Sequence, residues 1–132
     1  LGWAVTQKLP IIFICEDNDL SVLTKTEDRR SWKAVDLAKS LNMYAVDIAD
    51  DPWLIAHHVK KIKTSGKPGF INIRTVRGIW HAGTGVDNEL EWNRYELVEK
   101  EIESMGLSQE MIEINLKNKE KVDLIWQKLL QK

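Results

Sequence analysis

The clearest pattern in the chain is a short run, residues 9–15, that is almost entirely apolar and carries no charge. The run is too short for a buried helix and is rich in isoleucine, so we expect a strand that is buried on both faces. Polar residues 16–19 follow without a spacer. In a parallel sheet, the residues just past the carboxyl end of a strand line the ligand crevice. We therefore expect Asn18 to lie where an open α/β fold places its chemistry.

The rest of the chain alternates between helical and strand patterns. Apolar residues recur at helical spacing over residues 32–41, 53–64, 92–105 and from 108 almost to the end, whereas 43–48 and 70–76 fit strands. Residues 20–30 have no clean period and are expected to form a loop. The order strand, helix, strand, helix, strand and then two helices predicts an α/β fold. Its parallel sheet would be linked by right-handed crossover helices.

Polar residues, glycine and proline mark the expected ends of these helices. Ser31 is a suitable N-cap for the first helix. Asp51 can cap the second helix, with Pro52 at its first position, where proline is favoured. Residues 65–69, which include Gly66, are expected to form the turn that ends the second helix. Gly106 is expected to end the third helix, and Ser108 to cap the last one.

Parallel strands of this order bring their carboxyl ends to one edge of the sheet. That edge would collect polar clusters from three separate segments: Asn18 with its acidic neighbours; Asp47 with Asp50; and Arg74, Arg77 and His81. Topology alone therefore predicts a polar crevice.

Length, charge and cysteine content limit the classes of protein that the chain can belong to. The chain has 132 residues, of which 43% are apolar and 30% charged, and its net charge is −1. This length suits one domain, and the charge gives no reason to expect nucleic acid or a membrane as partner. The lone Cys15 cannot form an internal disulfide, so we expect a reducing, cytoplasmic setting. We interpret Cys15 as a core residue rather than a nucleophile.

Asn18 offers a neutral carbonyl oxygen that suits a hard cation such as magnesium. The alternative is that it is a turn residue, which is common for asparagine after a strand. Asp17 and Asp19 are adjacent residues that point apart, so one of them is expected to be a solvated or capping group. Magnesium usually keeps oxygens from phosphates, so a metal-bridged diphosphate fits a site with few protein ligands.

His81 lies in a glycine-bearing segment that follows the third strand. A histidine there can bind a phosphate or move protons, because its pKa lies near neutrality; the alternative is a solvent-exposed loop histidine. Arg77 is suited to hold an anion by its planar guanidinium. His57 and His58 are expected to be surface residues that face different directions on one helix.

Four stretches, taken in order, resemble the alpha subunit of thiamine-diphosphate-dependent 2-oxo-acid dehydrogenases. This subunit belongs to the first, decarboxylating component of the pyruvate, branched-chain 2-oxo-acid and acetoin dehydrogenase complexes. Residues 9–18 resemble its "LPviFvcENN" segment, and 46–50 resemble "VDGnD". Residues 66–71 resemble "GkGPtlIE", and 75–81 resemble "tYRxxgH". Tyr95 and the two C-terminal helices also continue the family's pattern, so the resemblance extends over essentially the whole chain.

The resemblance implies the thiamin diphosphate-binding fold and a set of site residues. Asn18 would bind Mg2+ through its side chain, and Leu20 would bind it through its backbone carbonyl. His81 would contact the diphosphate of thiamine diphosphate and assist acyl transfer to the lipoyl group, and Arg77 would join the cofactor-binding residues. The implied reaction is decarboxylation of a 2-oxo acid.

The family's remaining metal ligand is the aspartate of an upstream "GDG" motif, which this chain lacks. We therefore expect residues 1–132 to be the C-terminal part of a thiamine-diphosphate-binding domain, inactive alone. The implied partners are a beta subunit or second half of the enzyme, in a dimer or heterotetramer, and a lipoyl-bearing acyltransferase.

Several residues depart from the family pattern and suggest a divergent member, and two alternatives to the dehydrogenase stay open. Asp17 replaces an asparagine, Ala82 replaces the serine after the histidine, and Gly85 stands where an acid is usual. One alternative is a fragment of a transketolase-like thiamine enzyme. The other is a degenerate, non-catalytic domain that binds a partner.

Overall fold

The computed structural model describes residues 1–79 and 92–131. They form two compact units, Leu1–Trp92 and Asn93–Lys132.

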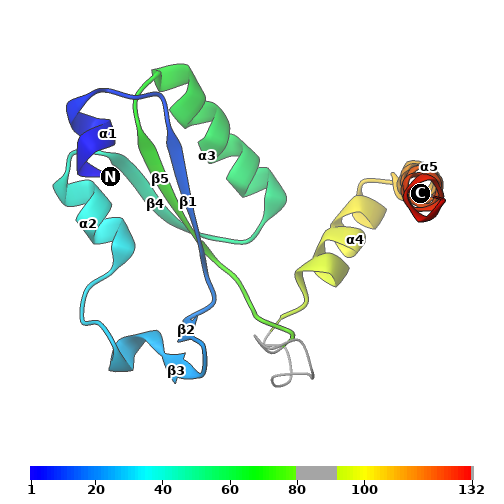
Figure 1. The fold of residues 1–132 in the computed structure, drawn as a ribbon, viewed down its shortest axis with the longest axis horizontal. Coiled ribbons are helices and arrows are strands. Elements are labelled where there is room, and N and C mark those ends of the chain that lie inside the picture. The colour runs from blue at the N-terminus through cyan, green and yellow to red at the C-terminus, as the bar shows by residue number, and fades with distance from the viewer. Residues whose placement is uncertain (80–91, 132) are drawn as a thin grey trace. The chain divides into compact units, whose positions relative to one another are not determined.

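The first unit is built on a three-stranded parallel sheet with the order β1-β5-β4 (Figure 1). The strands are β1 (Ile12–Asp17), β4 (Tyr44–Ala49) and β5 (Gly69–Arg74). Both neighbours of β5 run parallel to it, and crossovers containing a helix join the strands. The predicted α/β class with a parallel sheet is therefore confirmed.

Helices cover both faces of this sheet. On one face, α1 (Gly2–Thr6) and α2 (Ala34–Ser40) cover a cluster that includes Val35, Ala38 and Phe70. On the other, α3 (Pro52–Ser65) packs Ile62 against Ile71 and Ile73. Successive β5 side chains point to opposite faces, so one strand supplies both clusters.

The strand β1 differs from its prediction as a strand buried on both faces. Ile14 is 52% exposed and Ile11 is 38% exposed. The reason is strand order: β1 lies at an edge, next to β5 only, whereas the fully enclosed strand is β5, whose residues Gly69 to Ile73 are all buried. An apolar run predicts a strand, but it does not say which strand will be central.

The expected ends of α3 are confirmed. The Leu54 N–H donates to Asp51 Oδ1 over 2.8 Å, and Pro52 occupies the first turn. At the other end Gly66 adopts the left-handed conformation with φ 63°, which glycine tolerates best. The helix is one residue longer at each end than the apolar pattern predicted.

The segment before α2 was predicted less well. The helix begins at Ala34 with Lys33 at the N-cap and no side-chain cap, so the expected Ser31 cap is wrong. Trp32, expected in the helix, is 55% exposed, and Arg30 lies 4.9 Å from its ring centroid. Trp32 thus lies outside the helix and stacks with Arg30.

The expected loop over residues 20–30 contains short regular elements. These are β2 (Leu20–Ser21), β3 (Thr24–Lys25) and the 3-10 helix η1 (Thr26–Asp28). The two strands pair antiparallel around a turn in which Val22 has φ 60°. A β-branched residue is rare in that conformation, so the sequence carries no turn signal here.

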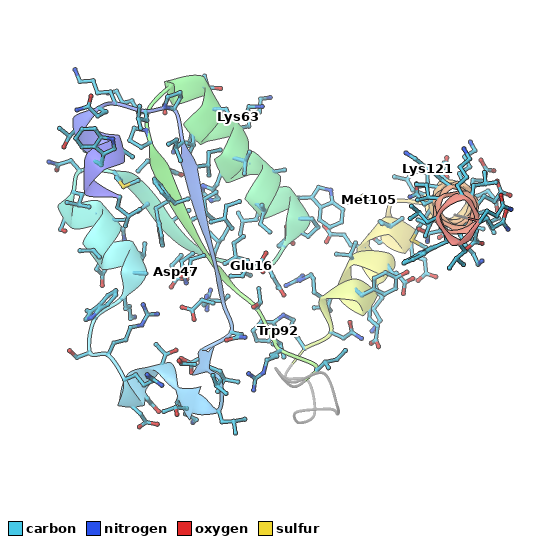
Figure 2. The ribbon with its side chains drawn as sticks, in the orientation of Figure 1. Glu16, Asp47, Lys63, Trp92, Met105 and Lys121 are labelled. Atoms are coloured by element: carbon cyan, nitrogen blue, oxygen red, sulfur yellow. The ribbon has the colours of Figure 1, made fainter. Side chains whose placement is uncertain are left out.

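The second unit contains α4 (Arg94–Ser104) and α5 (Ser108–Leu130), the two expected terminal helices. Asn93 caps α4 by accepting from the backbone of the first turn, and Gly106 follows it with φ 74°. The expected Ser108 cap is wrong, because Leu107 occupies the N-cap position without a side-chain bond. No residue of α5 is buried, and its apolar and polar side chains project around it (Figure 2).

None of the helices in residues 1–79 and 92–131 combines the length and the apolar character that crossing a membrane requires.

We predict that Gly69→Ala destabilises the first unit by about 1–3 kcal/mol through overpacking. A Cβ on Gly69 would lie 2.6 Å from Cδ1 and Cγ1 of Ile62 and 2.7 Å from its Cγ2, so the whole Ile62 side chain would have to move. Urea unfolding followed by circular dichroism measures the change. Gly2→Ala is the control, because nothing lies within 4 Å of its added Cβ. Equal stability of the two variants would refute this packing.

Candidate functional site

The carboxyl ends of the three strands form the polar edge that topology predicted. The register places Asp47 beside Asn72 and Asn72 beside Cys15, and Asp17 beside Arg74. Asp17 and Asp47 therefore flank the end of β5 from its two neighbouring strands. The pleat directs Asn72 to the same face as Phe70, the face that α2 covers.

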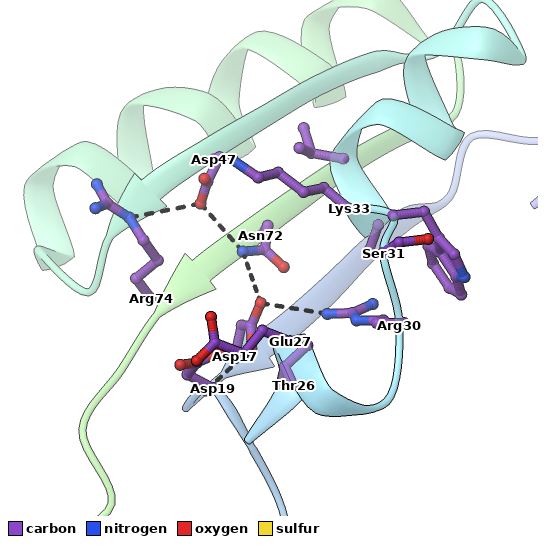
Figure 3. Close-up of a pocket in the computed structure, with 13 residues that line it drawn as sticks. Asp17, Asp19, Thr26, Glu27, Arg30, Ser31, Lys33, Asp47, Asn72 and Arg74 are labelled. Atoms are coloured by element: carbon purple, nitrogen blue, oxygen red, sulfur yellow. Dashed lines mark hydrogen bonds and ion pairs between the residues drawn. The ribbon is translucent and has the colours of Figure 1, made fainter. Parts of the chain in front are cut away.

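Asn72 joins the two aspartates across the sheet (Figure 3). Its Nδ2 donates to Asp17 Oδ2 over 3.3 Å and to Asp47 Oδ1 over 3.1 Å. Asn72 is only 5% exposed, so both hydrogen bonds lie at least partly out of water. A neutral amide is suited to this position, because its two N–H groups can each satisfy one carboxylate.

Each aspartate also has an arginine partner. Arg30 Nη2 lies 3.6 Å from Asp17 Oδ2, and Arg74 Nε lies 3.5 Å from Asp47 Oδ1. The second pair is more exposed than the first, so water screens it more and it contributes less. Together the arginines balance the two negative charges that Asn72 brings together.

These residues line a cleft of about 430 Å3 at the sheet edge. The remainder of its wall comes from the turn after β1, from η1, from the segment before α2 and from the start of α2: Asp19, Thr26, Glu27, Ser31, Trp32, Lys33, Ala34 and Val35. The sequence analysis missed Asn72 and Arg30. A signal for Asn72 existed, because it is the one polar residue inside the apolar stretch 70–73. Nothing in the sequence pattern pointed to Arg30.

Asn18 lies in the turn that follows β1, next to this cleft in the chain. Its Oδ1 accepts the Leu20 N–H over 3.1 Å, and Asp17 Oδ1 accepts the Asp19 N–H over 3.1 Å. Asn18 is thus a turn residue, as one interpretation held. The same bond brings the two expected metal ligands, Asn18 and Leu20, into one turn. A carbonyl oxygen has a second lone pair, so the metal role stays a prediction.

A second hollow, of about 460 Å3, lies beside this turn and is lined by both Asn18 and Leu20. It shares Asp17, Thr26, Arg30 and Trp32 with the first cleft.

Arg77 connects the segment after β5 to the β2–β3 hairpin. Its Nη1 donates to the Val22 carbonyl oxygen over 2.6 Å. The expected contact of Arg77 with an anion stays a prediction. His81 lies outside the described residues.

Asp47 and Asp50, which were expected in one cluster at this edge, have different partners. Asp47 lines the cleft, whereas both carboxylate oxygens of Asp50 accept from Trp92 Nε1, over 3.1 and 3.0 Å.

Cys15 has the character expected of a core residue. It is half-buried and packs against the cluster below α2. Burial raises the pKa of the Cys15 thiol, and the nearby Asp17 carboxylate raises it further. A raised pKa keeps the sulfur protonated, so it is a poor nucleophile.

His58 corrects the expectation of two surface histidines. It is half-buried, and its Nδ1 lies 2.7 Å from the Tyr44 hydroxyl oxygen. Burial lowers the pKa of His58, and the charges of His57 and Lys61 lower it further. His57 is exposed, as expected.

Among residues 1–79 and 92–131, no three His, Cys, Asp or Glu side chains are grouped so that they could hold a metal ion. No protein-family model matches the chain, and no curated protein or solved structure matches it either.

We predict that Asn72→Ala lowers the free energy of unfolding by about 1–3 kcal/mol, the usual cost of losing hydrogen bonds to charged groups. Asp17 and Asp47 would lose the donor that lies between them. Chemical denaturation measures the change. Gln7→Ala is the matched control, because Gln7 is an exposed amide of the same unit. A loss no larger than that of the control would refute the bridging role.

We also predict that stability falls as the pH drops below about 6.5, the ordinary pKa of histidine. The folded-state pKa of His58 is lowered, so the unfolded chain binds more protons in this range. The contribution is present above pH 6.5 and is lost as the pH falls through the folded-state pKa. Thermal melts from pH 7.5 to 5 measure the slope.

His58→Gln should flatten this slope relative to wild type, because the titrating ring is gone. His57→Gln, at the exposed neighbour, should retain most of it. An unchanged slope in His58→Gln would assign the pH dependence to another group.

Proposed function

We propose that the Leu1–Trp92 unit is the diphosphate-binding part of a thiamine-diphosphate-dependent 2-oxo-acid dehydrogenase alpha subunit. Such an enzyme decarboxylates a 2-oxo acid and passes the acyl group to a lipoyl carrier. The observation that carries the proposal is the turn after β1. There, Asn18 and Leu20, the two residues that the resemblance assigns to Mg2+, are joined by one hydrogen bond at the carboxyl edge of a parallel sheet, where open α/β folds bind ligands.

The donor chemistry of this turn fits a magnesium ion that arrives with its diphosphate. Asn18 would supply a side-chain oxygen and Leu20 a backbone oxygen, both neutral ligands of the kind that Mg2+ accepts. Two protein oxygens leave most of an octahedral shell to phosphate and water. The turn therefore suits a metal–diphosphate complex better than a free metal ion.

When bound, thiamine diphosphate supplies the electron sink for decarboxylation. The residues of this chain would bind and orient it. Arg77 holds the β2–β3 hairpin through Val22, and its planar guanidinium is proposed to bind a phosphate oxygen. His81 is proposed to contact the diphosphate and to assist acyl transfer. A beta subunit or second half of the enzyme would complete the site.

The degenerate, non-catalytic domain is the second candidate. One observation favours it: the carboxylate of Asp17, which directly precedes Asn18, is already engaged with Asn72 and Arg30. A transketolase-like thiamine enzyme would use Asn18 in the same way, so substrate assays distinguish it. Lipoyl-dependent oxidation of a 2-oxo acid supports the dehydrogenase, and ketol transfer supports the transketolase-like enzyme.

We predict that Asn18→Ala in the full-length protein abolishes magnesium-dependent binding of thiamine diphosphate, because it removes the side-chain ligand of the metal. Isothermal titration calorimetry with and without Mg2+ measures the binding. The matched control is Asp19→Asn, an exposed position of the same turn whose φ of 59° asparagine tolerates.

Loss of binding in Asn18→Ala together with retention in Asp19→Asn supports the site. Unchanged affinity in Asn18→Ala would remove Asn18 from it. Absence of binding in the wild-type protein would favour the non-catalytic domain.

A further inference from the structure

The edge strand β1 carries backbone groups that point away from the rest of the sheet. In the part of the chain that the structure describes, β1 pairs with β5 alone. The carbonyl oxygens of Ile11 and Asp17 point toward β5, because they accept N–H groups from its two ends over 3.0 and 2.9 Å. Backbone groups of successive strand residues alternate between the two sides. Those of Ile12, Ile14 and Glu16 therefore point to the free edge.

The side chains of the same three residues lie on the face of the sheet that α3 covers, because Ile12 packs against the cluster around Ile71. Ile14 is 52% exposed and Glu16 is also exposed. The other edge strand, β4, differs, because its only exposed residue is the charged Asp47. Proteins commonly protect edge strands with lysine or proline, and β1 contains neither. We therefore expect β1, rather than β4, to accept a further strand.

The charges at the two ends of β1 favour an antiparallel copy of the same strand. Lys63 and Lys67 lie beside its start, where they line a hollow of about 250 Å3 together with Ile12. Glu16 lies near its other end. In an antiparallel pair centred on Ile14, Glu16 of one copy is opposite Ile12 of the other and on the same face. Each glutamate would thus lie close to two lysines of the other copy, and the symmetry repeats this contact.

We propose that β1 pairs with β1 of a second copy of this chain, antiparallel about a two-fold axis that passes through Ile14. Ile12, Ile14 and Glu16 would exchange backbone hydrogen bonds with the second copy, and the two exposed Ile14 side chains would pack against each other. The pairing joins two three-stranded sheets into one continuous sheet. It uses neither Asn18 nor Leu20, so it does not depend on the thiamine diphosphate proposal.

The helices leave room for this pairing. The two-fold axis is perpendicular to the sheet, so both copies of α3 lie on the same face. α3 is seated over β5 through Ile62 and Ile71, and the two copies of β5 would be three strand spacings, or about 14 Å, apart. Packed helices need only about 8–10 Å between their axes. On the other face, α2 packs mainly against β4 and β5.

Analytical ultracentrifugation of the complete chain measures the association. We expect a monomer–dimer equilibrium with a Kd of about 1–100 µM, the strength of a small and partly polar interface. The dimer should weaken as the salt concentration rises, because salt screens exposed ion pairs. A chain that is still monomeric at about 200 µM would overturn the proposal.

Exchanging the charges tests which surface associates. Glu16→Lys should weaken the dimer by about tenfold, because it brings like charges together at two symmetric places. Adding Lys63→Glu and Lys67→Glu to this variant should restore the dimer. Glu120→Lys is the matched control, since it makes the same charge change at an exposed position of α5, and it should leave the Kd unchanged. Equal weakening by the control, or a combined variant that stays monomeric, would overturn the pairing.

A cross-link locates the two-fold axis. Hydrogen-bonded antiparallel residues have Cα atoms about 5.5 Å apart, which a disulfide can span. With Cys15→Ala as background, Ile14→Cys should therefore form a disulfide-linked dimer in a glutathione redox buffer. Gln7→Cys in the same background, at an exposed position outside β1, should not. A dimer that position 14 fails to cross-link would associate through another surface or register, which would overturn the proposal.

Discussion

The burial of β5 between β1 and β4 is the constraint on which the first unit depends. Its residues alternate between two apolar clusters, with Phe70 on one face and Ile71 and Ile73 on the other. Helices must therefore cover both faces, and crossovers of the parallel strands supply them. The close approach of Ile62 to Gly69 shows how tightly α3 is seated. The parallel register with β5 then places the carboxyl ends of β1 and β4 at the same edge of the sheet.

Asn72 lies where the apolar strand β5 reaches the polar edge of the sheet. A charged residue at that depth would need a full partner of opposite charge, and an apolar residue would leave Asp17 and Asp47 without the donor between them. The amide satisfies both carboxylates but has one oxygen left over. The amide at position 72 is thus explained by its place near the end of a buried strand, between the aspartates of the two neighbouring strands.

Sequence reasoning reached the elements whose signals are local. The cap at Asp51 with Pro52 and the stop at Gly66 need only nearby residues, and α3 matches its prediction closely. The exposure of Ile14 and the bridge at Asn72 depend on strand order and on partners distant in sequence. The β2–β3 hairpin was missed for another reason, because Val22 adopts a conformation that its side chain disfavours.

The conformation of Val22 also links the hairpin to the segment that follows β5. An unfavourable backbone conformation persists only where its surroundings enforce it, and the Val22 carbonyl is held by Arg77. Leu20 begins the same hairpin, and its backbone N–H donates to Asn18 Oδ1. The turn after β1 is therefore fixed from two sides, by its own side chain and by a residue that follows β5. A change in either contact would therefore affect a ligand bound at this turn. The hydrogen bond from Arg77 to Val22 thus connects two segments that topology had already assigned to the same edge.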